Sequence, residues 1–199
     1  MLGSSESSPS SQGVHVTRSG ANPLAIPQPL GLRDARLYFA TALLVLGNLL
    51  LPYALHRIPD AGRSFLPILF FTLIAGWRFG AKAGLLTGVL SPLVNHLLTG
   101  MPPAPVLQAL MLQSALLGLL AAGIASRSRR LTVPLLALVV LLHQALIVIP
   151  QLLQAGLRPA FATFELRLPG ILLQILGGFA LLWCLGRLLP QTPARTREG

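Results

Sequence analysis

The sequence predicts an all-α, polytopic membrane protein: a bundle of six transmembrane helices with both termini in the cytoplasm. Between Leu37 and Leu189 the chain consists of six long apolar runs, and over the whole chain 53% of residues are hydrophobic and only 10% are charged. The runs are apolar on all sides, and their lengths suit a hydrocarbon core about 30 Å thick. Lipid offers the backbone no hydrogen-bond partners, so we expect each run to be helical.

The expected spans are, in chain order, 37–56, 64–77, 80–98, 104–125, 131–155 and 161–189. The second span is short, and Pro67 is expected in its first turn, where a missing N–H is tolerated. The connection from Arg78 to Lys82 is tight enough to make the second and third spans an antiparallel hairpin. Pro169 is expected to kink the sixth span, because proline removes one backbone hydrogen bond.

Three segments make up the expected domain organisation. Residues 1–30 are rich in Ser, Gly and Pro, and we expect a disordered tail because they cannot bury enough apolar surface to fold. Residues 31–190 form the transmembrane domain, and 191–199 form a basic C-terminal tail. A cleaved secretory signal is not expected near Met1. Cys184 is the one cysteine, so the chain forms no internal disulfide.

The net charge is +10, and the charged residues lie between the apolar runs and at the termini. This distribution is typical of topology signals and not of a nucleic-acid surface. One side carries Arg18, Arg33, Arg36, Arg78, Lys82, Arg127, Arg129, Arg130, Arg187, Arg195 and Arg197, and the other Arg57, Arg63, Arg158 and Arg167. Positive residues favour the cytoplasmic side, so this bias predicts cytoplasmic termini and a location in the cell (inner or plasma) membrane.

Uncharged polar side chains gather toward the external ends of several expected helices. No Asp, Glu, Lys or Arg lies at the centre of an expected span, which disfavours a proton or ion relay. The candidate substrate-binding residues are Asn95, His96, Thr99, Gln108, Gln113, Gln151, Glu165 and Gln174. A cavity open to the outside is the simplest use for them. The plainer interpretation is contact with headgroups, water or neighbouring helices, and His143 is expected to bond between helices.

Small residues recur at four-residue spacing in the third and fourth spans. The residues expected to pack within the bundle or against a partner are Gly80, Gly84, Gly88, Gly118 and Ala122. Small side chains let membrane helices approach closely, so this pattern favours tight helix packing.

Catalytic and nucleotide-binding signatures are missing from the sequence. It contains no HExxH, no Cys/His ligand cluster, no carboxylate pair and no Walker lysine loop. We therefore expect neither an enzyme nor a protein with a cofactor or metal. If the chain moves a solute, an ion gradient or a partner ATPase must supply the energy.

The segment from Phe65 to Gly123 resembles the substrate-binding S component of energy-coupling factor (ECF) vitamin transporters. The resemblance is carried by the small-residue third span with Ser91-Pro92 and by the following loop, Leu98-Thr99-Gly100-Met101-Pro102-Pro103. Leu168-Pro169-Gly170-Ile171 is similar to the entrance of the family's sixth helix.

This resemblance implies a protein that binds a vitamin or similar micronutrient from outside the cell with high affinity. It also implies partners, namely a transmembrane coupling subunit and cytoplasmic ATPases, and toppling in the lipid bilayer to release the solute. One departure concerns docking. Many members carry an Ala-x-x-x-Ala pattern in the first helix, whereas Ala35, Ala40 and Ala42 have a different spacing.

A non-transport membrane scaffold, resembling the rod-shape MreD type, is the alternative. Such a protein has similar length and hydropathy but needs no convergent polar pocket. The substrate stays open at this point, with a corrinoid, a flavin and a smaller vitamin all compatible with the sequence.

Overall fold

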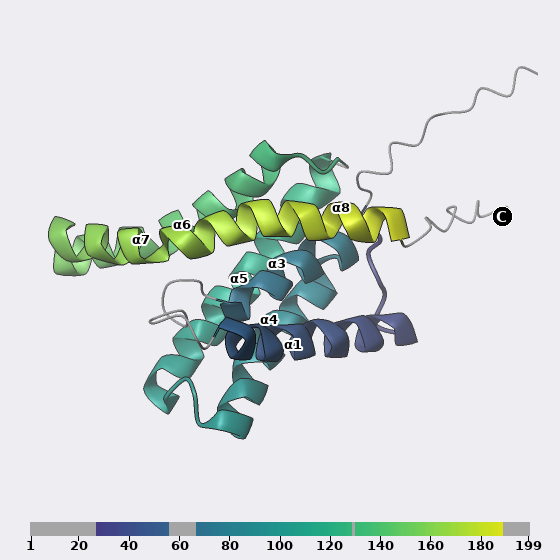
Figure 1. Cartoon of the computed structure of the whole chain (residues 1–199), viewed down its shortest axis with the longest axis horizontal. Coiled ribbons are helices and arrows are strands. Elements are labelled where there is room, and N and C mark those ends of the chain that lie inside the picture. The colour runs from purple at the N-terminus through teal and green to yellow at the C-terminus, as the bar shows by residue number, and fades with distance from the viewer. Residues whose placement is uncertain (1–26, 56–66, 129, 189–199) are drawn as a thin grey trace, which may run out of the picture.

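The structure, a computed structural model, is all-α throughout the residues that it describes, which are 27–55, 67–128 and 130–188. Its helices are α1 (Ala35–Leu55), α3 (Pro67–Phe79), α4 (Ala81–Thr99), α5 (Ala104–Ser128), α6 (Val133–Ala155), α7 (Leu157–Leu172), the π-helical turn η1 (Leu173–Gly177) and α8 (Gly178–Leu188). α7, η1 and α8 follow one another without a break, so the described chain forms six helical rods (Figure 1). Each rod coincides with one of the six expected apolar runs, which confirms the all-α, six-helix part of the prediction.

Proline and glycine mark the helix boundaries. α3 begins at Pro67, as expected, and Gly80 is the single residue between α3 and α4. Its φ of 87° is readily adopted only by glycine, so this tight turn depends on Gly80. The helix is not interrupted at Pro169, where a kink is expected. The irregularity occurs about one turn later, at Leu173, where the helix widens into η1.

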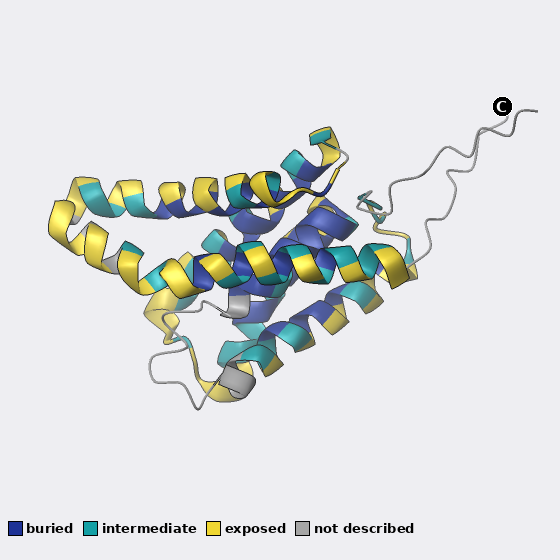
Figure 2. Ribbon diagram, turned by 45° about the horizontal axis from the view of Figure 1, so that its top comes forward, coloured by how far each residue is buried: buried dark blue, intermediate teal, exposed yellow. Residues whose placement is uncertain are grey.

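Three rods are both long and apolar enough to cross a membrane: Ala104–Ser128, Val133–Gln154 and Leu157–Leu188. α1 and α3 contain shorter apolar stretches, Ala35–Leu51 and Leu69–Phe79. Large apolar side chains are exposed along the outside of the molecule, among them Phe39, Leu112 and Leu153 (Figure 2). Soluble monomers rarely expose apolar surface on this scale, so these helices fit a multi-pass membrane protein.

α3 is the central helix of the bundle. Its side chains are buried almost without interruption, and Leu73, Ile74 and Trp77 belong to the main hydrophobic core. The helix packs against α1, α4, α5 and the η1–α8 part of the last rod. A helix covered from all sides must be apolar all round, which explains why the sequence of α3 has no polar face.

α4 and α5 approach each other at small residues. A Cβ atom on Gly118 would lie 2.5 Å from the carbonyl oxygen of Gly84, and one on Gly84 would lie 2.8 Å from the carbonyl oxygen of Gly118. Gly88 lies equally close to the backbone of Ala115. These three glycines therefore permit direct backbone contact between the helices. Gly80 and Ala122 are also buried, and both contribute to the lining of a cavity next to the α3–α4 turn.

The expectation of a disordered tail over residues 1–30 is wrong for residues 27–30, which form an extended strap on α3. The N–H of Gln28 donates to the carbonyl of Arg78 at 2.7 Å, and the N–H of Leu30 donates to the carbonyl of Phe79 at 3.1 Å. The last carbonyls of a helix have no partner within the helix, so the strap satisfies two of them. Residues 27–30 thus belong to the folded unit. The rest of that tail (1–26) and the expected tail at 191–199 lie outside the described residues.

Candidate ligand-binding site

Seven of the ten buried polar side chains among the described residues fall into two groups, and the first group joins four helices. The side-chain amide of Asn48 on α1 donates to the hydroxyls of Thr72 (3.3 Å) and Ser91 (2.8 Å). Its oxygen accepts from the backbone N–H of Phe71 at 2.9 Å. The Thr72 hydroxyl also bonds that of Ser114 at 3.2 Å. Asn48, Thr72, Ser91 and Ser114 are all fully buried.

This first group is a closed network. The amide nitrogen and the amide oxygen of Asn48 both have hydrogen-bond partners. The hydroxyls of Thr72, Ser91 and Ser114 are each hydrogen-bonded to another member of the group. A satisfied network of this kind fixes the rotation of membrane helices relative to one another and leaves little capacity for an incoming ligand. We assign it to packing.

The second group lies where α6 packs against α5 and against the α7–η1 rod. The Nε2 atom of His143 lies 2.9 Å from the carbonyl oxygen of Gln113, and Arg167 donates to Oε1 of Gln144 at 3.5 Å. His143, Gln144 and Gln174 are at most 1% exposed. We call His143, Gln144, Arg167 and Gln174 the polar band.

The polar band contains hydrogen-bonding atoms that have no protein partner. A carbonyl oxygen only accepts, so Nε2 of His143 carries a proton toward Gln113, and a neutral ring then offers Nδ1 as an acceptor. Within the described residues, Nδ1 of His143, Nε2 of Gln144 and both amide atoms of Gln174 are buried without a partner. Each such atom costs roughly 1–3 kcal/mol. Two acceptors and two donors are therefore available to a bound molecule.

Gln174 marks one end of the polar band. It lies in η1, seven residues after Arg167 and thus about 10 Å further along the same rod. π-helical turns inside α-helices frequently occur at functional sites. The side chain of Gln174 is fully buried, so its amide faces the protein interior.

An apolar pocket of about 200 Å³ lies between α6 and α7, about one helical turn along the chain from Gln144 and from Arg167. It is lined by Val148 and Leu152 on α6 and by Leu157, Phe161 and Phe164 on α7. Val148 follows Gln144 by four residues, and Phe164 precedes Arg167 by three, so each lies on the same helix face as its polar neighbour. The Gln144–Arg167 pair therefore lies about one turn from the pocket on both helices, and neither of its side chains lines the pocket.

Three of the predicted site residues meet elsewhere, at the turn between α4 and α5. The Asn95 side chain donates to the carbonyl of Met101 and Nδ1 of His96 to that of Pro102, both at 2.7 Å. The Thr99 hydroxyl donates to the carbonyl of Asn95 at 2.7 Å and accepts from the N–H of Met101 at 3.2 Å. In this structure these side chains hold the backbone of the turn that leads into α5.

The remaining predicted site residues are dispersed. Gln108 and Glu165 are exposed. Gln151 is half-buried, and its Oε1 has no partner among the described residues. Gln113 supplies its backbone carbonyl to His143, and Gln174 belongs to the polar band. The structure thus brings two of the predicted residues to one site.

Gln144 and Arg167 are not among the site residues that the sequence singles out. Arg167 is expected near the start of the sixth span, but α7 begins at Leu157, which places Arg167 about three turns inside the rod. Arg167 still lies outside the central part of the Leu157–Leu188 rod, in agreement with the expectation that no charged residue lies at the centre of a span. Its half-buried charge on an apolar rod is the signal that could have singled it out, since ionisable residues within membrane helices are rare and usually functional.

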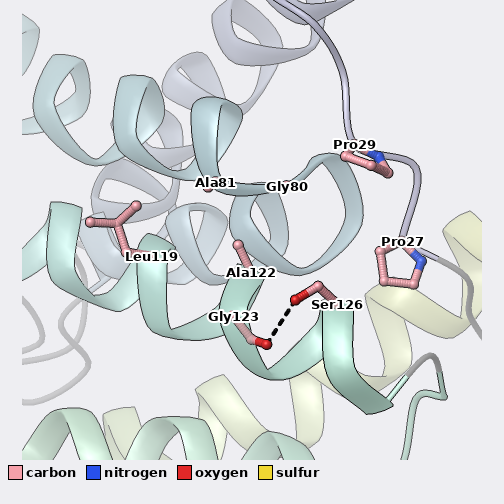
Figure 3. A pocket seen from close by; sticks show the side chains of 8 residues that line it. All are labelled: Pro27, Pro29, Gly80, Ala81, Leu119, Ala122, Gly123 and Ser126. Carbon is pink, nitrogen blue, oxygen red and sulfur yellow. Dashed lines mark hydrogen bonds between the residues drawn. The ribbon is translucent and has the colours of Figure 1, made fainter.

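A second cavity, of about 720 Å³, lies between the strap, the start of α4 and the end of α5 (Figure 3). Its lining residues are Pro27, Pro29, Gly80, Ala81, Leu119, Ala122, Gly123 and Ser126. The Ser126 hydroxyl donates to the Gly123 carbonyl at 2.9 Å within the same helix. Ser126 supplies the one polar side chain among these lining residues.

Neither a metal centre nor a known relative helps to interpret the polar band. Among the described residues, no three His, Cys, Asp or Glu side chains gather as metal ligands would. Comparisons with protein-family models, curated proteins and solved structures find no match for the chain. The chemistry of the site therefore has to be inferred from its own atoms.

Proposed function

We propose that this chain is the membrane-embedded, substrate-binding subunit of an ECF-type importer and takes up a vitamin or similar micronutrient. The observation that carries the proposal is the polar band, with its four buried hydrogen-bonding atoms that lack a partner among the described residues. A solute with complementary groups would satisfy these atoms and remove the cost of burying them. The sequence resemblance to S components supports the same function.

The proposal includes six transmembrane spans with cytoplasmic termini. Exposed Arg33, Arg36 and Lys82 lie near the starts of α1 and α4, and exposed Arg127 and Arg130 lie around the end of α5. Positive residues gathered at the ends of helices favour the cytoplasmic side for those ends. In this orientation the apolar pocket between α6 and α7 lies on the external side of the Gln144–Arg167 pair, where a solute would enter.

The proposed subunit binds solute but does not energise its transport. The sequence has no nucleotide-binding motif, so the energy would come from cytoplasmic ATPases through a transmembrane coupling subunit, as the resemblance implies. The first helix lacks the Ala-x-x-x-Ala spacing, so docking on that subunit would use a different surface.

Mass spectrometry of small molecules released from the purified full chain tests the proposal. The protein is expressed in cells supplied with a broad vitamin mixture, and wild type is compared with Gln174→Met and with Gln108→Met, a matched change at an exposed position. We expect a stoichiometric solute from wild type and Gln108→Met. The amount of solute released from Gln174→Met should be at least about tenfold lower, because a methionine side chain cannot form the two hydrogen bonds of the amide.

Two results would contradict the proposal. Equal amounts of solute from all three proteins would show that Gln174 takes no part in binding. No solute from wild type, even when it is purified in lipid nanodiscs, would favour the non-transport scaffold.

A further inference from the structure

We infer that the solute is a small organic anion, with its carboxylate held by Arg167 and its apolar part in the pocket between α6 and α7. This inference rests on the proposed function and names the class of solute. The starting observation is the positive charge of Arg167, because Gln144, the partner to which it donates a hydrogen bond, is neutral.

Arg167 is a half-buried cation about three turns from the start of the Leu157–Leu188 rod, next to the apolar part of that rod. Its hydrogen bond to Gln144, at 3.5 Å, is long and uses a neutral acceptor. Glu165, two residues earlier, is exposed and lies on the other side of the helix. A guanidinium offers five N–H donors in a planar fork that matches the two oxygens of a carboxylate. A carboxylate therefore complements the guanidinium of Arg167 in both charge and shape.

The adjoining pocket limits the size and chemistry of the rest of the molecule. Its volume is about 200 Å³, and its lining is entirely apolar. An apolar cavity of about 150 Å³ holds a molecule the size of benzene. The pocket thus suits one ring or a short chain, and the side chains of Phe161 and Phe164 suit an aromatic ring in particular.

The other atoms of the polar band add a further requirement. Nε2 of Gln144 has no partner among the described residues and can donate a second hydrogen bond to the carboxylate. Nδ1 of His143 also has no partner in the described part of the chain, so it favours an N–H or O–H donor on the solute. The class is a single-ring monocarboxylate that also carries one hydrogen-bond donor.

The test uses a panel of single-ring monocarboxylates, each paired with its primary amide, added to the purified full chain in lipid nanodiscs. Thermal unfolding is followed by tryptophan fluorescence, since Trp77 is buried in the core. The variants are Arg167→Gln, Arg167→Lys and the control Arg158→Gln, which removes the same charge from an exposed position on α7. Replacing a carboxylate by an amide keeps the shape of the probe and removes its charge.

We expect at least one acid to raise the unfolding temperature of wild type and of Arg158→Gln. Its amide should need at least about tenfold higher concentration for the same shift, because the charge-assisted bond is lost. Arg167→Lys should respond weakly, and Arg167→Gln should not respond. If Arg167→Gln does not fold, the inference is tested by comparing the effect of each acid with that of its amide on wild type and on Arg167→Lys.

The inference is overturned if amides act as well as acids, if Arg167→Gln responds like wild type, or if no acid acts on wild type. Mass spectrometry of released molecules separates this failure from that of the proposed function. A neutral solute released from wild type would keep the binding function and remove the anion. No released solute, together with no response to the panel, would remove both.

Discussion

At the scale of single residues, two buried amides have opposite consequences for the fold. Asn48 has partners on three sides, whereas Gln174 has none among the described residues for either side-chain atom. A satisfied amide stabilises a bundle, and an unsatisfied one destabilises it. Exchanging each for an apolar side chain should therefore shift stability in opposite directions.

We expect Gln174→Met to raise the stability of the solute-free protein by about 1–3 kcal/mol, because two unpartnered atoms are removed at similar volume. The gain in stability would accompany the loss of solute described above, which is the usual trade-off at a binding site. Thermal unfolding of the solute-free protein measures it, with Gln108→Met expected to change stability by less than about 0.5 kcal/mol. A loss of stability in Gln174→Met would mean that the amide supports the fold.

Asn48→Leu should lower stability by about 1–3 kcal/mol, because it breaks three hydrogen bonds between helices and leaves the N–H and hydroxyl partners buried. The control is Asn95→Leu, which removes one bond to a carbonyl in the α4–α5 turn at a partly exposed position. Unfolding in a denaturant series compares the two variants. Equal losses would contradict the role that we assign to the network of Asn48.

At the scale of the elements, the contact between α4 and α5 determines how closely the central helices pack. Gly118→Ala should destabilise the protein by about 1–3 kcal/mol, because its Cβ would lie 2.5 Å from a backbone oxygen that cannot rotate away. Gly123→Ala makes the same change on the same helix with its nearest neighbour 3.8 Å away. That control should be neutral or stabilising by up to about 1 kcal/mol, through helix propensity.

Thermal unfolding of both alanine variants in nanodiscs checks this expectation. If Gly118→Ala proves as stable as Gly123→Ala, the two helices are not in backbone contact.

At the scale of the whole molecule, the distribution of Lys and Arg predicts the orientation in the membrane. Green fluorescent protein fused after Ser128 or after Gly199 should be fluorescent, as expected for a cytoplasmic position. Alkaline phosphatase fused at the same two sites should be inactive. Fusions after Gly156, in the connection between α6 and α7, should show the reverse. The reason is the positive-inside bias of eleven cations against four. Active alkaline phosphatase after Gly199 would contradict the orientation.

The helices themselves could be predicted from the sequence almost completely. The expected runs and the observed rods differ by a few residues at their ends, as at 161 against Leu157. Hydropathy is a property of each segment alone, and a lipid environment leaves a long apolar segment few alternatives to a helix. Gly80 likewise indicates its turn locally, because a positive φ excludes most other residues.

The site could be predicted only in part, because a hydrogen-bond partner is a property of two segments at once. Asn95 and His96 lie at a helix end as expected, yet neighbouring loop carbonyls take up their hydrogen bonds. Gln144 and Arg167 are 23 residues apart, and their contact requires a particular register between α6 and α7. No pattern within either helix specifies that register.

The sequence by itself thus determined that the region between the two tails consists of apolar helices with an asymmetric distribution of positive charge at their ends. Only the tertiary structure decided which polar groups meet: Asn48 with Ser91, 43 residues away, and Arg167 with Gln144. The reason is that burial in lipid acts on each helix separately, whereas helix rotation and register come from side chains and glycines packed between helices. The polar band exists because that packing places three buried polar side chains and the half-buried Arg167 along one helix junction and leaves some of their atoms unmatched.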